Sequence, residues 1–432
     1  MTSVPVESLD LEGRGVARVA GKVTFIDAAL PGERVEIQTW RRKPRFDLAN
    51  AVRIVQASSM RVVPRCPHYD RCGGCSLQHL DARAQVAIKQ RVLEDNLARI
   101  GRVQPEVMLP PIHGPAWQYR QRARMSVRMV RGKGGVLVGF RERRTHYVVE
   151  MDSCEVLPAH ISAMIAPLRA ALSQISLAAR IPQVEVAVGD DADVLILRIL
   201  DPLSADDLEC LRAFARAHRV DLYVQPGGPA SLQLVEPTSA RPLVYSLPEF
   251  DLTLAFRPND FTQVNYAVNR VLVRRAVTML DPRPGEHIAD LFCGLGNFTL
   301  ALARRGAQVV GVDDSEDLAR RGAENAHRNG LAERVTFWPG NLYADAADLL
   351  RRLPALDKML LDPPRDGAAA VVQALGAQAP QRLLYVSCNP STLARDAGVL
   401  VAEKGYRFRA AGVVNMFPHT SHVESIALFE RG

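Results

Sequence analysis

The sequence has no long apolar run that is free of charged residues, which argues against a membrane-spanning segment. Its first ten residues include Glu7 and Asp10 and no apolar core segment, so we expect no secretory signal peptide. The seven cysteines are an odd number, which is atypical of a disulfide framework and favours metal binding or catalysis. We therefore expect a cytoplasmic protein without a membrane partner, acting as a monomer.

The composition is ordinary for a soluble globular protein, with 47% hydrophobic and 23% charged residues. A chain of 432 residues is long enough for two or three domains. Residues 61–150 hold seventeen Lys or Arg and seven Asp or Glu, although the whole chain carries a net charge of only +7. A basic block of this kind suits a polyanion such as nucleic acid, and a solvated surface without a partner is the alternative.

One cysteine stands where a predicted strand turns into a predicted helix, in the sequence V-S-C-N-P-S-T-L. The apolar run Leu383–Val386 predicts a buried parallel strand, and the residues after it predict a helix capped by Ser391 or Thr392. Cys388 then lies at the carboxyl edge of a sheet, where a helix dipole can lower its pKa. It is our candidate nucleophile, and a buried structural cysteine is the alternative.

Four other cysteines have the spacing of a metal centre. A C-x5-C-x2-C cluster is followed far downstream by one more thiol, and the set is Cys66, Cys72, Cys75 and Cys154. Four thiolates can complete either a tetrahedral zinc site or a [4Fe-4S] cluster, and three clustered cysteines with a remote fourth favour iron and sulfur. With four cysteines available, we expect His68 and His79 to be ordinary polar side chains.

Two further patterns precede residue 130. Short β-like runs at 15–19, 22–26, 34–40 and 51–57 are separated by polar turns, which predicts a small all-β barrel. From Trp117 to Met129 apolar and polar residues alternate, as expected for a strand. Its polar face carries Arg120, Arg122, Arg124 and Arg128. This face suits RNA phosphates, and ion pairs with a neighbouring strand are the alternative.

The carboxy-terminal part alternates apolar strands with helical runs, which predicts a doubly wound α/β sheet. A glycine-bearing turn, Cys293–Thr299, follows the first strand but lacks the third glycine of the dinucleotide-binding motif. The next strand ends in Asp313, which can accept both ribose hydroxyls of S-adenosylmethionine or NAD. An adenine edge can be recognised near Gly340-Asn341.

Three motifs together resemble the RNA uracil-C5 methyltransferases: D-F-T-Q-V-N at 260–265, D-P-P-R at 362–365 and S-C-N-P at 387–390. Residues 8–17 and 31–35 resemble the TRAM domain, an OB-like RNA-binding barrel. The resemblance implies a TRAM barrel at 1–58, a central α+β domain with a [4Fe-4S] cluster at 59–250, and a Rossmann-like class I methyltransferase domain at 251–432. Because both front modules are present, it also implies the branch that acts on 23S rRNA.

The resemblance implies a role for each matching residue. Cys388 would add to C6 of uracil as the nucleophile, and Glu424 would accept the C5 proton. The S-adenosylmethionine pocket would be formed by Gln263, Phe292, Asn297, Asp313, Asn341 and Asp362. Glutamate is frequent in the family where Asp313 stands. Cys66, Cys72, Cys75 and Cys154 would hold the cluster, and Arg41, Arg42, Lys43 and Arg45 would contact RNA.

Topology also favours Glu424, because an antiparallel last strand beside the fifth returns to the edge that carries Cys388. The alternatives for the whole chain are a methyltransferase acting on cytosine C5 or a base nitrogen, methylation at another rRNA or tRNA site, and an iron-sulfur RNA-binding factor without activity. We expect Cys293 and Cys210 to be packing residues.

Overall fold

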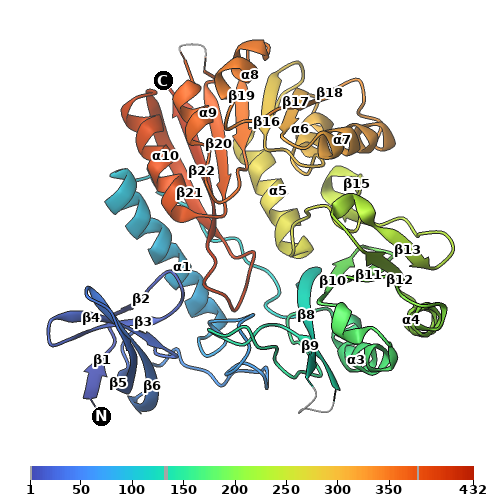
Figure 1. Cartoon of the computed structure of the whole chain (residues 1–432). Coiled ribbons are helices and arrows are strands. Elements are labelled where there is room, and N and C mark those ends of the chain that lie inside the picture. The colour runs from blue at the N-terminus through green and yellow to red at the C-terminus, as the bar shows by residue number, and fades with distance from the viewer. Residues whose placement is uncertain (1, 131–134, 377–378) are drawn as a thin grey trace.

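The computed structural model describes residues 2–130, 135–376 and 379–432 of the chain. Figure 1 shows the amino-terminal sheet at lower left, the central sheet at lower right, and the carboxy-terminal sheet with its helices at the top. Arg131 and Lys133, which belong to the basic block, lie outside the described residues. Among those that are described, no helix combines the length and the apolar character that crossing a membrane requires.

The amino-terminal sheet has six strands in the order β1-β5-β6-β4-β3-β2. They are β1 (Thr2–Pro5), β2 (Ser8–Leu9), β3 (Gly15–Val19), β4 (Lys22–Asp27), β5 (Arg34–Arg42) and β6 (Phe46–Gln56). The four predicted strands are confirmed, with β6 longer than expected, whereas β1 and β2 were not predicted. Alternate apolar side chains such as Ala17, Ile26 and Val35 form its core. Arg41, Arg42 and Arg45, near the turn from β5 to β6, are exposed.

The central sheet has the order β13-β12-β11-β10-β8-β9. Its strands are β8 (Arg122–Val130), β9 (Gly135–Gly139), β10 (Gln183–Val188), β11 (Asp193–Arg198), β12 (Asp221–Gln225) and β13 (Gln233–Glu236). The helices α2 (Ala159–Ala163), α3 (Ile165–Gln174) and α4 (Ala205–His218) belong to the same part of the chain. The hairpin of β14 (Val244–Leu247) and β15 (Leu252–Ala255) leads to the carboxy-terminal part.

The predicted arginine face of β8 is only partly correct. The strand begins at Arg122 and not at Trp117, and the predicted alternation holds from there, since Ala123, Met125 and Val127 are buried. Arg122 was expected to face RNA, yet its guanidinium is largely buried and donates a 2.8 Å hydrogen bond to the carbonyl of Pro258.

Arg124 pairs with Glu185, which lies opposite it in β10, at 3.0 Å. This ion pair is the alternative that the sequence left open, and it satisfies the arginine without an anion from outside. Arg128 is exposed. With Arg122 buried and Arg124 paired, fewer arginines of this strand are available to RNA than the four predicted.

The carboxy-terminal sheet has eight strands in the order β18-β17-β16-β19-β20-β22-β21-β7. They are β7 (Val107–Met108), β16 (His287–Leu291), β17 (Gln308–Asp313), β18 (Val335–Pro339), β19 (Lys358–Leu361), β20 (Arg382–Ser387), β21 (Tyr406–Val414) and β22 (Glu424–Arg431). The five strands from β16 to β20 are parallel and β22 runs antiparallel to β20. The predicted doubly wound sheet and its antiparallel last strand are confirmed.

Helices cover both faces of this sheet, as a buried parallel sheet requires (Figure 1). They are α1 (Ala82–Asn96), α5 (Tyr266–Leu280), α6 (Thr299–Arg304), α7 (Glu316–Arg328), α8 (Ala346–Arg352), α9 (Ala369–Ala374) and α10 (Pro390–Ala402). Leu383 and Tyr385 of β20 pack with α1, α8, α9 and α10, whereas Leu384 packs with α5, α6 and α7. Side chains of one strand therefore alternate between two cores.

Residues 82–112 depart from the proposed domain boundaries. They were expected in the central domain, yet Leu93 of α1 packs in the core of the carboxy-terminal sheet and β7 pairs with β21. Close packing at Gly101 fixes this arrangement, because a Cβ there would lie 2.3 Å from the carbonyl oxygen of Ala394 in α10. The boundaries 1–58, 59–250 and 251–432 stay a prediction, with the difference that residues 82–112 pack on the carboxy-terminal sheet.

Candidate active site

Cys388 and Glu424 are brought together by the register of two neighbouring strands. The pairing of β20 with β22 sets Ser387 opposite Ser425. Cys388 follows the first of these residues and Glu424 precedes the second, so the register brings the thiol and the carboxylate to the same edge of the sheet, one residue beyond the last paired position. Glu424 also acts to raise the pKa of Cys388, which agrees with this proximity. Cys388 is partly exposed, and Glu424 is 7% exposed.

The turn after Cys388 differs from the predicted one in its cap. Helix α10 begins at Pro390, and the side chain of Asn389 accepts a 3.0 Å hydrogen bond from the backbone N–H of Ser391. The prediction of a cap at Ser391 or Thr392 is therefore wrong. An asparagine cap followed by proline at the first helical position is a common start, since proline has no N–H to leave unsatisfied.

The environment of Cys388 raises the pKa of its thiol to about 11, whereas a lowered pKa was predicted. Burial contributes most, the carboxyl groups of Glu424 and Asp362 act in the same direction, and Arg365 opposes them. The prediction considered only the helix dipole. It placed Glu424 and Asp362 at the same edge of the sheet but left out the effect of their charges on the thiol.

Asp362 and Asp290 bring further carboxyl groups to this edge of the sheet. Burial, with Glu424 and Asp290 nearby, raises the pKa of Asp362 well above its usual range. Asp290 is fully buried in β16, and burial raises its pKa to about 7. The hydroxyl of Thr299 donates a 2.6 Å hydrogen bond to its Oδ2, while its Oδ1 has no partner among the described residues. An unpartnered acceptor here suits a ligand that donates a hydrogen bond.

The glycine-bearing turn and the end of β17 are tied together by Asp313. Its carboxylate accepts hydrogen bonds from the N–H groups of Gly294, at 2.8 Å, and Ser315, at 3.0 Å. Phe292 has φ of 65°, a conformation that is uncommon for a residue with a side chain. Its ring lies 5.6 Å from that of Tyr343, which the sequence did not single out.

The remaining predicted pocket residues are held to different degrees. The amide of Asn297 forms hydrogen bonds of 2.9 and 3.0 Å with the amide of Asn269, so its orientation is fixed. The side-chain oxygen of Asn341 accepts two backbone N–H groups of its own turn. Gln263 forms no hydrogen bond with another described residue, which leaves its amide available to a ligand. Its predicted role remains a prediction.

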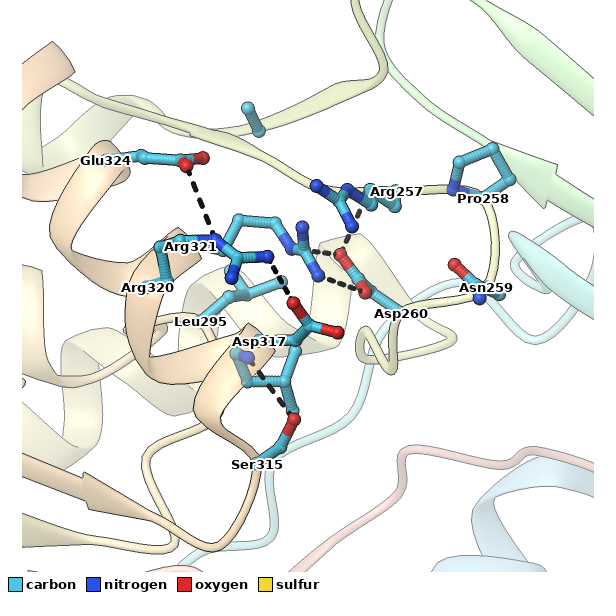
Figure 2. A network of polar contacts seen from close by, with 12 residues as sticks. Arg257, Pro258, Asn259, Asp260, Leu295, Ser315, Asp317, Arg320, Arg321 and Glu324 are labelled. Atoms are coloured by element: carbon cyan, nitrogen blue, oxygen red, sulfur yellow. Dashed lines mark hydrogen bonds and ion pairs between the residues drawn. The ribbon is translucent and has the colours of Figure 1, made fainter. Parts of the chain in front are cut away.

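A buried ion pair fixes the loop that carries Gln263. Figure 2 shows the guanidinium of Arg321 in α7 against the carboxylate of Asp260, with its Nη2 2.9 Å and its Nε 2.5 Å from the two oxygens. The backbone N–H of Arg257 also donates to Asp260, at 2.7 Å. The neighbouring Phe261 is 72% exposed. Because α7 follows Asp313 directly, the ion pair links this loop to the glycine-turn side of the site.

The four clustered cysteines line one cavity of about 180 Å³. Cys66, Cys72, Cys75 and Cys154 are all buried and none forms a disulfide. Burial is the main reason that the pKa of Cys75 is raised to about 12, and the three other thiols add to it.

Arginine and histidine residues support the loop around this cavity. Arg143 donates hydrogen bonds to the carbonyls of Cys72, at 3.1 Å, and Cys75, at 2.7 Å. His79 is buried, contacts the hydroxyl of Tyr69 and is absent from the cavity wall, as is His68. This agrees with their predicted role as ordinary polar side chains.

Comparison with known families now bears on this geometry. The sequence pattern of the family described as tRNA (Uracil-5-)-methyltransferase matches residues 81–335 and 348–432. The chain belongs to the tRNA (uracil-5-)-methyltransferase family. The TRAM pattern matches residues 2–46, which confirms the predicted TRAM domain in front of the methyltransferase part.

Relatives of this methyltransferase resemble it over their whole length. It is 58% identical to a protein of Aromatoleum aromaticum over 427 residues, covering 99% of each chain. It is 57% identical to a protein of Azoarcus sp. over 432 residues, covering each chain completely. Both carry the name 23S rRNA (uracil(1939)-C(5))-methyltransferase RlmD.

A solved structure has the same fold. The Pyrococcus abyssi tRNA (uracil-54, C5)-methyltransferase, in complex with S-adenosyl-L-homocysteine, aligns with a TM-score of 0.74 at 24% identity. The alignment covers 99% of this methyltransferase and all of that chain. The two therefore share their architecture from end to end.

Sequence reasoning missed several residues of this methyltransferase that contribute to the site. The sequence could have indicated Asp290, because it is the one carboxylate within the apolar run 288–291. Nothing in the sequence distinguishes Arg321 and Lys89, because each lies among other charged residues of an amphipathic helix. Only the tertiary structure distinguishes them, as both are almost completely buried.

The raised pKa of Cys388 predicts how the thiol reacts. Alkylation by iodoacetamide is expected to accelerate steadily from neutral to alkaline pH, because only the thiolate reacts and the thiol is still protonated at neutral pH. Glu424→Gln removes a neighbouring negative charge, so it lowers the pKa of Cys388 and increases the alkylation rate at any given pH. Mass spectrometry of the Cys388 peptide measures this rate.

A matched control for this measurement is Glu430→Gln, which removes a carboxylate from the other end of β22. It is expected to leave the alkylation rate of Cys388 unchanged. Equal rates for Glu424→Gln and the unmodified protein would contradict the electrostatic account of the site.

Proposed function

We propose that this chain transfers a methyl group from S-adenosyl-L-methionine to C5 of uracil 1939 in 23S rRNA and so forms 5-methyluridine. The observation that carries the proposal is the strand register that sets Cys388 beside Glu424 at the carboxyl edge of the sheet. The names of the full-length relatives, which are 57–58% identical, supply the substrate and the position.

The thiolate of Cys388 begins the reaction by adding to C6 of the uracil. The new S–C6 bond moves the electron pair of the C5–C6 double bond towards C5 and the C4 oxygen, which makes C5 nucleophilic enough to accept the methyl group. S-adenosyl-L-homocysteine leaves with the electron pair of the broken sulfur–methyl bond. Arg365 favours the thiolate, since it lowers the pKa of Cys388 against the effect of the carboxylates.

Glu424 completes the reaction by accepting the proton from C5. The electron pair of the C5–H bond re-forms the C5–C6 double bond, the S–C6 bond breaks, and Cys388 leaves as a thiolate. A carboxylate that is 7% exposed, at the same edge of the sheet as the thiol and within its electrostatic range, is well placed for this task.

Six residues are proposed to bind S-adenosyl-L-methionine beside the reacting thiol. Five end or follow parallel strands of the sheet, where such folds bind ligands, and Gln263 precedes α5. The five are Phe292, Asn297, Asp313, Asn341 and Asp362. Gln263 and Asp362 are also proposed to contact the polar edge of the uracil, and Asp362 interacts electrostatically with Cys388.

The front of the chain is proposed to hold the RNA. The exposed Arg41, Arg42 and Arg45 of the TRAM domain suit contacts with the phosphate backbone. A uracil in folded RNA must leave its stack before a thiol can approach C6, and binding of the flanking RNA stabilises that state.

The proposed substrate is tested by mapping 5-methyluridine in rRNA from cells with and without the gene for this chain. Loss of 5-methyluridine at position 1939 alone is the expected result, and plasmid-borne chain restores it. A plasmid encoding Cys388→Ala is expected not to restore it. An unchanged level at this position would refute the assignment, and loss from a tRNA position would indicate the alternative substrate.

The cysteine cavity is proposed to hold a [4Fe-4S] cluster. The donor set fits, because four buried thiols line one cavity of about 180 Å³. In the part of the chain that is described, no three His, Cys, Asp or Glu side chains converge closely enough to hold a single metal ion. The choice of iron and sulfur over zinc therefore rests on the sequence spacing, in which three clustered cysteines are followed by a remote fourth.

Metal analysis of protein purified without air tests this proposal. We expect a brown protein with about four iron and four sulfide per chain, as the cluster formula requires. Cys75→Ser is expected to lower both contents, while Cys210→Ser, a cysteine outside the cavity, leaves them unchanged. A colourless protein with about one zinc per chain would contradict the cluster.

A further inference from the structure

Lys89 is a buried lysine that the proposed reaction does not use. It lies in α1 and is 1% exposed. Its Nζ donates hydrogen bonds to the side-chain oxygen of Asn415, at 2.8 Å, and to the carbonyl of Phe417, at 2.9 Å. Both acceptors belong to residues 415–423, the segment that connects β21 to β22 and ends directly before Glu424.

Burying an ammonium group is costly, and a hydrophobic residue at this position would pack without that cost. Burial lowers the pKa of Lys89 to about 7, and Glu424 acts in the opposite direction, which places the carboxylate within reach of the lysine's charge. A buried titratable group beside a catalytic carboxylate points to a functional reason for its presence.

The same face of α1 holds the connecting segment at a second point. Gln85 lies one helical turn before Lys89 and is fully buried. Its Oε1 accepts a 2.8 Å hydrogen bond from the backbone N–H of His419, and its Nε2 lies 3.2 Å from the Nδ1 of that histidine. Helix α1 therefore fixes the segment through two buried polar side chains. In Figure 1 this helix runs beside α10 on one face of the sheet.

We propose that Lys89 is a positioning residue for Glu424: through its two hydrogen bonds it fixes the β21–β22 segment that leads into the carboxylate accepting the C5 proton. This inference rests on the proposed function. It assigns Lys89 to the proton-removal step alone, because its hydrogen bonds are to the segment that leads into Glu424 and not to the turn that carries Cys388.

The test is Lys89→Met, which keeps the length of the side chain and removes its charge and hydrogen bonds. We expect kcat to fall by roughly 10-fold or more, part of what a general base contributes, while KM for the RNA stays the same. We also expect the methylated covalent adduct to accumulate on a denaturing gel, because only its breakdown is slowed.

Lys358→Met is the matched control. Lys358 is also buried and pairs with Glu286 at 2.6 Å, but it lies at the opposite edge of the sheet, at the start of β19. This substitution is expected to lower stability without adduct accumulation. If Lys89→Met behaves in the same way as Lys358→Met, Lys89 is only structural and the inference is wrong.

A double-mutant cycle shows whether Lys89 acts through Glu424. Adding Lys89→Met to Glu424→Gln is expected to slow adduct breakdown no further than Glu424→Gln alone. Additive losses would overturn the inference. If the unmodified enzyme itself forms no adduct with 5-fluorouridine RNA, the proposed function fails instead, so the two failures are distinguishable.

Discussion

Methyl transfer is expected to fall by roughly 10⁴-fold or more when Cys388 is replaced by alanine, as is typical when a covalent nucleophile is removed. The physical reason is that C5 of uracil is too weak a nucleophile until a thiolate has added to C6. Transfer of a radioactive methyl group from S-adenosyl-L-methionine to RNA measures the loss. Binding of S-adenosyl-L-methionine is expected to persist, because Cys388 is not among its proposed ligands.

Two control substitutions make this result specific. Cys210→Ala removes a thiol in α4 of the central part, away from the carboxy-terminal sheet, and is expected to leave turnover unchanged. Cys293→Ala removes a buried thiol beside the glycine-bearing turn and tests whether any cysteine near the pocket matters. Full turnover by Cys388→Ala would favour methylation of a base nitrogen, which needs no thiolate.

Glu424→Gln is expected to slow product release by roughly 10²–10⁴-fold, the usual contribution of a general base. The amide keeps the shape of the carboxylate but cannot accept the C5 proton, so the enzyme stays attached to a ring that already carries the new methyl group. A denaturing gel with labelled RNA detects this species as a slowly migrating band. The same band is expected to be weak for the unmodified enzyme.

The label distinguishes the two steps of the reaction. With a radioactive methyl group, Glu424→Gln is expected to give a labelled protein–RNA band, whereas Cys388→Ala gives none. Release of 5-methyluridine at the normal rate by Glu424→Gln would show that another group accepts the proton. Asp362 would be the next candidate, since it interacts electrostatically with both Cys388 and Glu424.

The order of elements was largely predictable because the apolar runs are strongly periodic. The strand before Cys388, the strand ending at Asp313 and the antiparallel last strand all lie where the sequence placed them. Family-level motifs predicted most candidate residues at the carboxyl edge for the same reason, since all of them except Gln263 lie at or near the end or the start of a strand.

The electrostatics of the site could not be predicted in this way. The pKa of Cys388 is raised and not lowered, first because the thiol is partly buried and then because of the charges of Glu424 and Asp362. The depth of burial and the balance of these charges depend on the packing of the whole domain. The partner of Arg124 depends on the register of two strands, which no local pattern specifies. Residues 82–112 pack on the carboxy-terminal sheet because Leu93 is part of its core. The other residues of that core lie far from Leu93 in the sequence, so no local pattern predicts the contact.

The most direct test of the account is to identify the residue that bonds to the pyrimidine. RNA containing 5-fluorouridine at the target position should trap the complex, since fluorine cannot leave C5 as a proton and the S–C6 bond therefore persists. After digestion, mass spectrometry is expected to find the methylated fluorouridine attached to the peptide that contains Cys388. Attachment to another residue, or turnover of this RNA without any adduct, would contradict the central claim.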